Sequence, residues 1–257
     1  MRNTLVVLAS LLFSCLVNTG SAAAQADWRW QHPFAQGNGL EGVHFMDART
    51  GTAVGGSGSI IRTSNGGRLW VQQNSGTAHA LSSIAFSDSL HGTIVGFFGT
   101  VLRTTDGGAT WSPHGIATQN ILYGVSFTDS NTGTTVGDGG RIYRTTDGGT
   151  TWNAQSSGTQ MTLQAVHFTD AANGTAVGWR GEIVNTTDGG DTWSVQTSRL
   201  MYPTLLDIAL QPFGGFSMGI AVGSEGSILT REAQYSWVVS ASGTTVALYG
   251  VCMAGNG

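Results

Sequence analysis

Three aspartates recur at one position and are the first candidates for chemistry. Asp106, Asp147 and Asp188 are each followed by two glycines and, five residues on, by a tryptophan. An aspartate can act as a general acid or base, or it can ligate a metal ion. A reaction needs one asymmetric site, however, and here the same residue occurs in three copies. We therefore expect each aspartate to be structural and to accept hydrogen bonds from the amides of its own turn.

Paired carboxylates would instead indicate a glycosidase, in which two acids flank the sugar bond. Asp138 with Glu182 or Glu225 could supply such a pair from adjacent loops, and this enzyme remains the alternative to a non-catalytic protein. His44 and His167 share one repeat position, and we expect both to be strand residues. The sequence has no His-x-x-x-His or Cys-x-x-Cys spacing, so we expect no metal and no cofactor.

The aspartates belong to a nonamer that recurs along the chain. Arg144–Trp152 reads RTTDGGTTW, and its copies are RTTDGGATW at 103–111, NTTDGGDTW at 185–193 and RTSNGGRLW at 62–70. The closing tryptophans are 41 residues apart, and a period near 40 residues indicates one supersecondary unit repeated along the chain. Asp-Gly between strand-like residues predicts a hairpin at each copy.

Each repeat reads as four short strands separated by turns. In the third copy we expect strands at Tyr123–Phe127, Thr134–Gly137 and Arg141–Arg144, and a fourth at Trp152. Four strands per repeat predict an all-β fold, a β-propeller with four-stranded blades. Apolar residues at matched positions, such as the phenylalanine of each first strand, should pack between neighbouring blades. The repeats cover about 40–74, 81–115, 122–156, 163–197 and 205–240, and another begins at 246–257.

The two ends of the repeat array predict a ring that does not close. The hairpin of the fifth copy is replaced by Arg231–Tyr235, and of a sixth copy only the first strand, Ala247–Val251, is present. Asp27–Gln31 resembles a fourth strand without its first three. We expect five whole blades, a partial sixth and an open seam, in a chain truncated from a six- or seven-bladed parent. The rival expectation is a closed five-bladed ring with 246–257 as a tail.

The N-terminal residues 1–26 predict a signal peptide. Arg2 is the positive start, 5–17 is an apolar segment too short to span a bilayer, and Ala24–Ala26 fits the small-x-small cleavage pattern. The propeller domain would then be 27–257, without a transmembrane span, in the periplasm or outside the cell. A loose match to a lipobox makes a lipid anchor at Cys15 the minor alternative.

Composition narrows the partners of the mature domain. Charged residues make up 10% of the chain, lysine is absent and the net charge is −4, which gives no support to nucleic-acid binding. The 39 glycines favour short strands and tight turns. Cys252 is the single cysteine of the mature domain, so we expect no internal disulfide, and we expect a monomer.

The repeat resembles a known family. The Thr-x-Asp-x-Gly-x-Thr-Trp pattern at 104–111, 145–152 and 186–193 is similar to the Asp-box, or BNR, repeat. With Gly-Val-x-Phe-x-Asp before it and Val-Gly-x-x-Gly between strands, the repeat resembles the photosystem II stability/assembly factor family. This resemblance implies a non-catalytic propeller that binds a partner protein or assists assembly, in the thylakoid lumen if the host is phototrophic. Asp-boxes also occur in sialidases, so a glycan-binding or sialidase-like propeller is the alternative.

Function should lie where the copies differ at matched loop positions. In propeller geometry the turns between second and third strands share one face with the linkers before the first strands, opposite the Asp-Gly hairpins. Aromatic and arginine side chains in these loops are typical of protein interfaces. The residues expected to bind a partner are Phe97, Phe98, Trp179, Arg180, Arg199, Met201 and Tyr202. A second candidate is the row Arg62, Arg103 and Arg144, either a basic strip for a partner or an exposed edge position.

Overall fold

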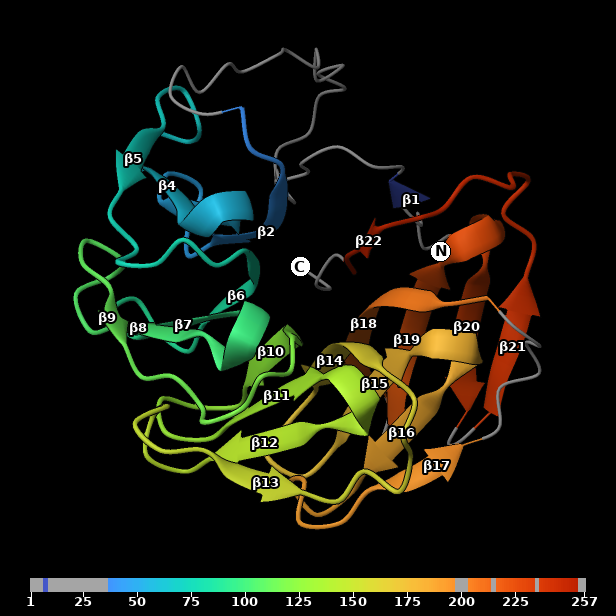
Figure 1. The fold of residues 1–257 in the computed structure, drawn as a ribbon. Coiled ribbons are helices and arrows are strands. Elements are labelled where there is room, and N and C mark those ends of the chain that lie inside the picture. The colour runs from blue at the N-terminus through green and yellow to red at the C-terminus, as the bar shows by residue number, and fades with distance from the viewer. Residues whose placement is uncertain (1–6, 9–36, 197–202, 214–215, 234–235, 254–257) are drawn as a thin grey trace.

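The computed structural model describes residues 7–8, 37–196, 203–213, 216–233 and 236–253. Its main body is five antiparallel four-stranded sheets, arranged as blades around a common axis (Figure 1). The all-β propeller predicted from the repeats is therefore confirmed. The expected strand at Asp27–Gln31, the possible anchor at Cys15 and the loop residues Arg199, Met201 and Tyr202 lie outside the described residues.

The first four blades share one strand pattern, with a 3-10 turn (η) between the second and third strands. Blade one is β2 (Leu40–Phe45), β3 (Gly51–Gly55), η1 (Gly56–Gly58), β4 (Ser59–Thr63) and β5 (Val71–Gln73). Blade two is β6 (Leu81–Phe86), β7 (Gly92–Gly96), η2 (Phe97–Gly99), β8 (Val101–Thr104) and β9 (Ser112–Pro113). Blade three is β10 (Leu122–Phe127), β11 (Gly133–Gly137), η3 (Asp138–Gly140), β12 (Ile142–Thr145) and β13 (Asn153–Gln155). Blade four is β14 (Leu163–Phe168), β15 (Gly174–Gly178), η4 (Trp179–Gly181), β16 (Ile183–Thr186) and β17 (Ser194–Gln196).

Blade five keeps this order with longer strands. It is β18 (Leu205–Phe213), β19 (Phe216–Gly223), η5 (Ser224–Gly226), β20 (Ile228–Ala233) and β21 (Ser236–Ser240). Trp237 lies within β21, opposite Arg231, whereas the tryptophans of the other four blades come just before the fourth strand. Loss of the Asp-Gly-Gly turn therefore lets the third and fourth strands pair further along their length.

The core lies between successive blades. Val54 and Ile60 of blade one, for example, cluster with Leu81, Ile94 and Leu102 of blade two. Equivalent clusters join blades two and three, three and four, and four and five. This confirms the expected packing between blades, since a single thin sheet cannot bury both of its faces.

The phenylalanine of each first strand also has a partner in its own blade. Phe86 meets Trp111 edge to face, with ring centroids 5.9 Å apart, and the same pair occurs in blades one, three and four. The small residue that starts the second strand makes room for the ring, because a Cβ on Gly92 would lie 2.7 Å from Phe86. The position therefore serves a contact within the blade in addition to the expected packing between blades.

The ring is open between blade one and blade five (Figure 1). The first strands follow one another around the axis from β2 through β6, β10 and β14 to β18, and β22 (Gly250–Val251) lies next to β18. A short β1 (Val7–Leu8) pairs antiparallel with β22. Within the described ranges no strand of blade one packs on a strand of blade five, so the rival closed ring of five blades is not observed. A sixth blade is not established.

Candidate functional site

The η turns and the linkers before the first strands meet on one face of the propeller. The amide of Phe97 donates to the Ala80 carbonyl (2.9 Å), just before the first strand of the same blade, and the amide of Gly99 donates to Asn120 (2.9 Å), before that of the next blade. The Asp-Gly-Gly turns lie at the other end of each sheet, where Gly107 donates to Leu90 in the turn between first and second strands. The predicted separation of two loop faces is therefore correct. We call the first one the η face.

The central residue of every η turn has a left-handed backbone. Four of these residues are not glycine, namely Ser57, Phe98, Arg180 and Glu225, with φ between 54 and 57°. This region is uncommon for residues with a Cβ and is retained only where the surroundings impose it. In each η turn the first amide donates to a carbonyl of the linker of its own blade, and in η2 the Gly99 amide also donates to the linker of the next blade. The variable side chain at the centre of each turn is thus carried by a fixed backbone.

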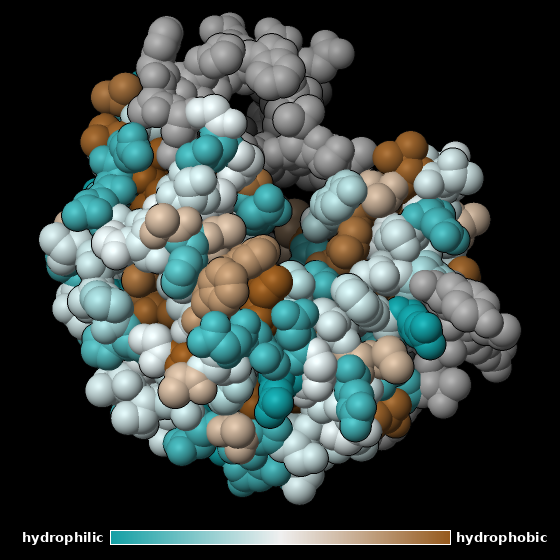
Figure 2. Space-filling model, in the orientation of Figure 1, coloured by the Kyte–Doolittle hydropathy of each residue, from teal (hydrophilic) through white to brown (hydrophobic). Residues whose placement is uncertain are grey.

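Aromatic side chains stand on the η face at blades two and four. Phe98 is 53% exposed and Trp179 is 49% exposed. The ring of His79, from the linker of blade two, lies 5.0 Å from Phe98, and its Nδ1 is 3.0 Å from the Thr100 hydroxyl. Figure 2 shows an apolar patch on this face, near the η2 turn, surrounded by polar residues. No sequence pattern indicates a role for His79, because its position in the linker carries no signal of which residues lie beside it in the fold.

The three acids considered for glycosidase chemistry all lie in or beside η turns. Asp138 begins η3, Glu182 follows η4 and Glu225 is central in η5. The carboxylate of Asp138 accepts a hydrogen bond from the Ile121 amide (3.0 Å). Burial, and then the charge and hydrogen bond of Asp138, raise the pKa of Tyr123 to about 12. Asp138 is thus already engaged by groups of its own blade.

The Asp-box aspartates lie on the opposite face and are engaged within their turns. Asp106 Oδ1 accepts from the Thr110 amide (2.9 Å) and the Thr104 hydroxyl (2.7 Å), and Oδ2 accepts from the Thr110 hydroxyl (2.6 Å). These bonds, those of Thr110 first, lower the pKa of Asp106 to about 2. Blades three and four repeat the arrangement with Asp147 and Asp188. The turn is longer than the predicted tight hairpin, because residues 105–111 separate β8 from β9 and two successive glycines have positive φ.

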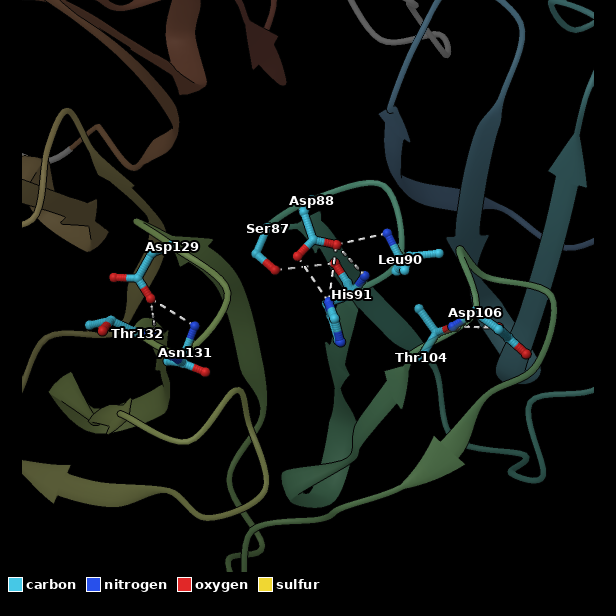
Figure 3. Close-up of polar contacts among 9 residues, drawn as sticks. All are labelled: Ser87, Asp88, Leu90, His91, Thr104, Asp106, Asp129, Asn131 and Thr132. Carbon is cyan, nitrogen blue, oxygen red and sulfur yellow. Dashed lines mark hydrogen bonds and ion pairs between the residues drawn. The ribbon is translucent and has the colours of Figure 1, made fainter.

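A second set of aspartates occupies the turns between first and second strands on the same face. Asp88 Oδ1 accepts from the amides of Leu90 (2.7 Å) and His91 (2.8 Å), and its carboxylate pairs with the His91 ring (Figure 3). Asp129 likewise accepts from Asn131 and Thr132 (Figure 3). The Phe-x-Asp recurrence in the sequence could have indicated these turns. Like the Asp-box aspartates, they accept hydrogen bonds from the backbone amides of their own turns.

The arginine row reaches from each blade to the next. Arg62 donates to the Gly107 carbonyl (3.2 Å), and a Cβ on Gly148 would lie 2.9 Å from the Arg103 guanidinium. Arg144 pairs with Asp191 in the following Asp-box turn. All three arginines are half-buried. The three arginines therefore lie in contacts between blades and are not the exposed edge positions that were one of the two expectations. The other expectation, a basic strip for a partner, stays a prediction.

His44 and His167 lie in first strands, β2 and β14, as predicted. Burial lowers the pKa of His44 and of His167, as expected for strand residues in a packed sheet. Within the described part of the chain, no group of three or more His, Cys, Asp or Glu residues is arranged to hold a metal ion. None of the described helices is long and apolar enough to cross a membrane.

Comparison with known proteins places the chain among propellers. No family model matches it, and no curated protein matches it. The structure titled YCF48 bound to D1 peptide is 25% identical with a TM-score of 0.56, and the match covers 68% of this chain and 57% of that one. YCF48 from Cyanidioschyzon merolae is 20% identical (TM-score 0.60), covering 83% of this chain and 75% of that chain. The GH74 xyloglucanase from Xanthomonas campestris is 14% identical (TM-score 0.57), and the match covers 75% of this chain and 36% of that chain.

These likenesses confirm the β-propeller fold and the expected likeness to the photosystem II assembly factor propellers. The chain spans little more than half of the peptide-bound YCF48 chain. The similar structures include a peptide-binding protein and a glycoside hydrolase.

Proposed function

We propose that this chain is a non-catalytic propeller that binds a partner protein on its η face and assists an assembly process. The observation that carries the proposal is the pair of half-exposed aromatic side chains, Phe98 and Trp179, on turns of fixed backbone. Exposed aromatics on a rigid support lose little conformational entropy on binding and supply most of the energy at interface hot spots.

The arrangement suits an extended segment of a partner. Between Phe98 and Trp179 lies the η3 turn, whose central residue is Gly139, and nothing lies within 4 Å of the point where its Cβ would be. A chain crossing this bare turn would reach the aromatic rings of blade two on one side and of blade four on the other. Arg180, exposed beside Trp179, would add a cation for a carboxylate or a main-chain carbonyl. Phe97, Arg199, Met201 and Tyr202 complete the proposed surface.

The likeness to YCF48 supports the same interpretation. One of the matched YCF48 structures holds a D1 peptide, so a propeller similar to this chain binds a segment of another protein. The proposed role includes export of domain 27–257 after removal of signal peptide 1–26, because a partner in the thylakoid lumen or periplasm requires it.

A glycan-binding or glycoside-hydrolase propeller is the second candidate. It is favoured by the likeness to GH74 structures and by the presence of Asp138, Glu182 and Glu225 on the same face as the aromatics. Aromatic faces also bind sugar rings, so the aromatics alone do not separate the two candidates.

The test compares one peptide and one glycan on the same variants. The D1 peptide and xyloglucan oligosaccharides are titrated by calorimetry against the wild type, a Phe98→Ala/Trp179→Ala double variant and a Leu90→Ala control. Leu90 is 52% exposed on the opposite face, which matches the loss of exposed apolar surface. We expect the double variant to bind peptide at least about 10-fold more weakly, with Leu90→Ala unchanged.

Two results would count against the proposal. One is unchanged peptide binding by a double variant that melts at the wild-type temperature. The other is binding or cleavage of xyloglucan by the wild type that the double variant loses, with no peptide binding by either protein.

A further inference from the structure

The fourth strand of blade five, β21, is an edge strand unlike its counterparts in the other blades. It is five residues long, Ser236–Ser240, whereas β5, β13 and β17 have three residues and β9 has two. It is the last strand of its sheet, and among the described residues it pairs only with β20. In Figure 1 it lies at the rim of the propeller, away from the axis. Its other side therefore presents a row of main-chain amides and carbonyls that no described strand uses.

The features that protect other edge strands from pairing are missing from β21. The fourth strands of the other blades are short, and β9 also contains Pro113. β21 reads SWVVS, without proline, glycine or a charged residue, and residues 233–257 contain no charged side chain. Val238 is 48% exposed and Val239 is 50% exposed.

The strand is also held firmly in place. Trp237 is 6% exposed and belongs to the cluster of buried residues that joins blades four and five. On its inner side, Val238 lies opposite Thr230 and Val239 lies opposite Leu229 of β20. A long, uncharged and apolar edge on a fixed sheet is a template on which another strand can pair.

The sequence of β21 is complementary to itself. When a two-fold axis relates two antiparallel strands, one residue must lie opposite its own copy, because opposed residues alternate between two hydrogen-bonding types. The register that uses the whole strand places Val238 opposite Val238 of the second copy. Ser236 then lies opposite Ser240, and Trp237 lies opposite Val239. Valine with valine, serine with serine and an aromatic with a β-branched residue are favourable cross-strand pairs, and no like charges meet.

We propose that β21 pairs antiparallel with β21 of a second copy of this chain, so that two four-stranded sheets become one sheet of eight strands. The occupant is a second copy because an uncharged strand carries no charge pattern that would select a different protein, whereas it complements itself at every position. About four to six main-chain hydrogen bonds join the strands in this register. The contact is small beside a standard interface, so we expect a dissociation constant of about 1 µM or weaker.

The dimer goes beyond the proposed function and leaves its site free. The η turns lie at one end of the sheets, whereas β21 lies along the outer rim. Each copy can therefore still bind a partner segment on its η face. The proposal departs from the monomer that was expected from the sequence.

Sedimentation velocity of the full chain at concentrations from ~5 to ~500 µM tests the pairing. We expect the wild type to shift from monomer to dimer across this range. Val238→Lys and Val238→Glu each place two like charges opposite each other, so each variant alone should associate at least about 10-fold more weakly. A 1:1 mixture of the two variants should regain the association, because lysine then lies opposite glutamate.

A matched control and a second readout complete the test. Val195 is 49% exposed on β17, the fourth strand of blade four, and Val195→Lys should associate like the wild type. Hydrogen exchange of the wild type needs no variant, and it serves if the Val238 variants do not fold. Alternate amides of β21 should exchange more slowly at high than at low protein concentration, while those of β17 stay unchanged.

Three results would overturn the proposal. The first is a wild type that remains a monomer at ~500 µM, including one whose β21 instead pairs with a strand of another protein. The second is a folded Val238→Lys variant that associates as tightly as the wild type. The third is a 1:1 mixture of folded Val238→Lys and Val238→Glu that stays monomeric where the wild type is a dimer.

Discussion

Replacing Asp147 by alanine should destabilise the propeller by removing a defined set of hydrogen bonds. The carboxylate accepts from the Thr151 amide (2.9 Å), the Thr145 hydroxyl (2.8 Å) and the Thr151 hydroxyl (2.6 Å). A hydrogen bond to a charged group is worth about 1.5–3 kcal/mol when buried, but this carboxylate is almost fully hydrated. Water replaces much of what is lost, so we expect a loss of about 1–2 kcal/mol in unfolding free energy for the three bonds together.

Blade one supplies the control for this change. Asn65 stands in the aspartate position and keeps two equivalent bonds, from the Leu69 amide (2.9 Å) and the Thr63 hydroxyl (3.0 Å). Its third bond is missing because leucine replaces the threonine. Asp147→Asn should therefore lose only the bond from the Thr151 hydroxyl and destabilise by less than half as much as Asp147→Ala.

The pH dependence follows from the same bonds. The hydrogen bonds from Thr151 lower the pKa of Asp147 to about 2 in the folded protein. Because the folded value lies below the ordinary one, the stabilisation is present above pH ~4 and is lost as the pH falls toward ~2. The difference in stability between the wild type and Asp147→Ala should narrow over this interval.

Urea unfolding followed by tryptophan fluorescence measures these differences, with a melting-temperature shift of about 3–6 °C for Asp147→Ala as a second readout. Peptide binding by the folded variant should be unchanged, since the Asp-box turns lie opposite the η face. The reasoning fails if Asp147→Ala is as stable as the wild type at neutral pH, or if it loses binding while remaining stable.

Two further changes test the packing. Gly137→Ala should lower the free energy of unfolding by more than about 3 kcal/mol, because the new Cβ would lie 2.1 Å from the Ile121 carbonyl oxygen. Gly139→Ala should lower it by only about 1 kcal/mol, for its positive φ, since its Cβ meets nothing within 4 Å. Equal losses of unfolding free energy in urea would contradict this. Arg144→Met should lower the free energy of unfolding by less than about 1 kcal/mol, because its partner Asp191 is exposed, and this loss should shrink in high salt. A loss that does not depend on salt would show that packing of the side chain on the next blade, and not its charge, is the main contribution.

Much of the fold could be predicted from the sequence, because the similarity between the copies shows where each repeat unit begins and ends. Four tryptophans at a 41-residue period located the blades, and alternating strand and turn residues located most strand bounds to within about two residues. The fifth blade departs from the repeat: its first strand, β18, is nine residues long and ends at Phe213, whereas the first strands of the other four blades are six residues long. The Phe-x-Asp sequence that leads into the turn after the first strand of the other four blades is replaced here by Leu210, Gln211 and Pro212. No aspartate therefore closes that turn at the usual place, and β18 pairs with β19 further along.

Only part of the candidate site could be predicted from the sequence. The sequence identified the loops that share a face, because alternate turns of an antiparallel sheet lie at the same end. It did not reveal that the His79 ring lies tilted beside the Phe98 ring, with centroids 5.0 Å apart, or that the arginine row contacts the following blade. These contacts join residues of different elements through side-chain conformations that no local pattern encodes.

The sequence by itself determined the unit: four strands, the turns between them and the aspartates that close those turns. All of these depend on interactions between residues within about ten positions of one another, so local backbone preferences and hydrogen bonds are enough to set them. Only the tertiary structure decided how units meet, such as Arg62 on Gly107 or Asp207 on Val251, 45 and 44 residues apart. The angle between neighbouring blades fixes those contacts, and that angle results from the packing of whole sheets.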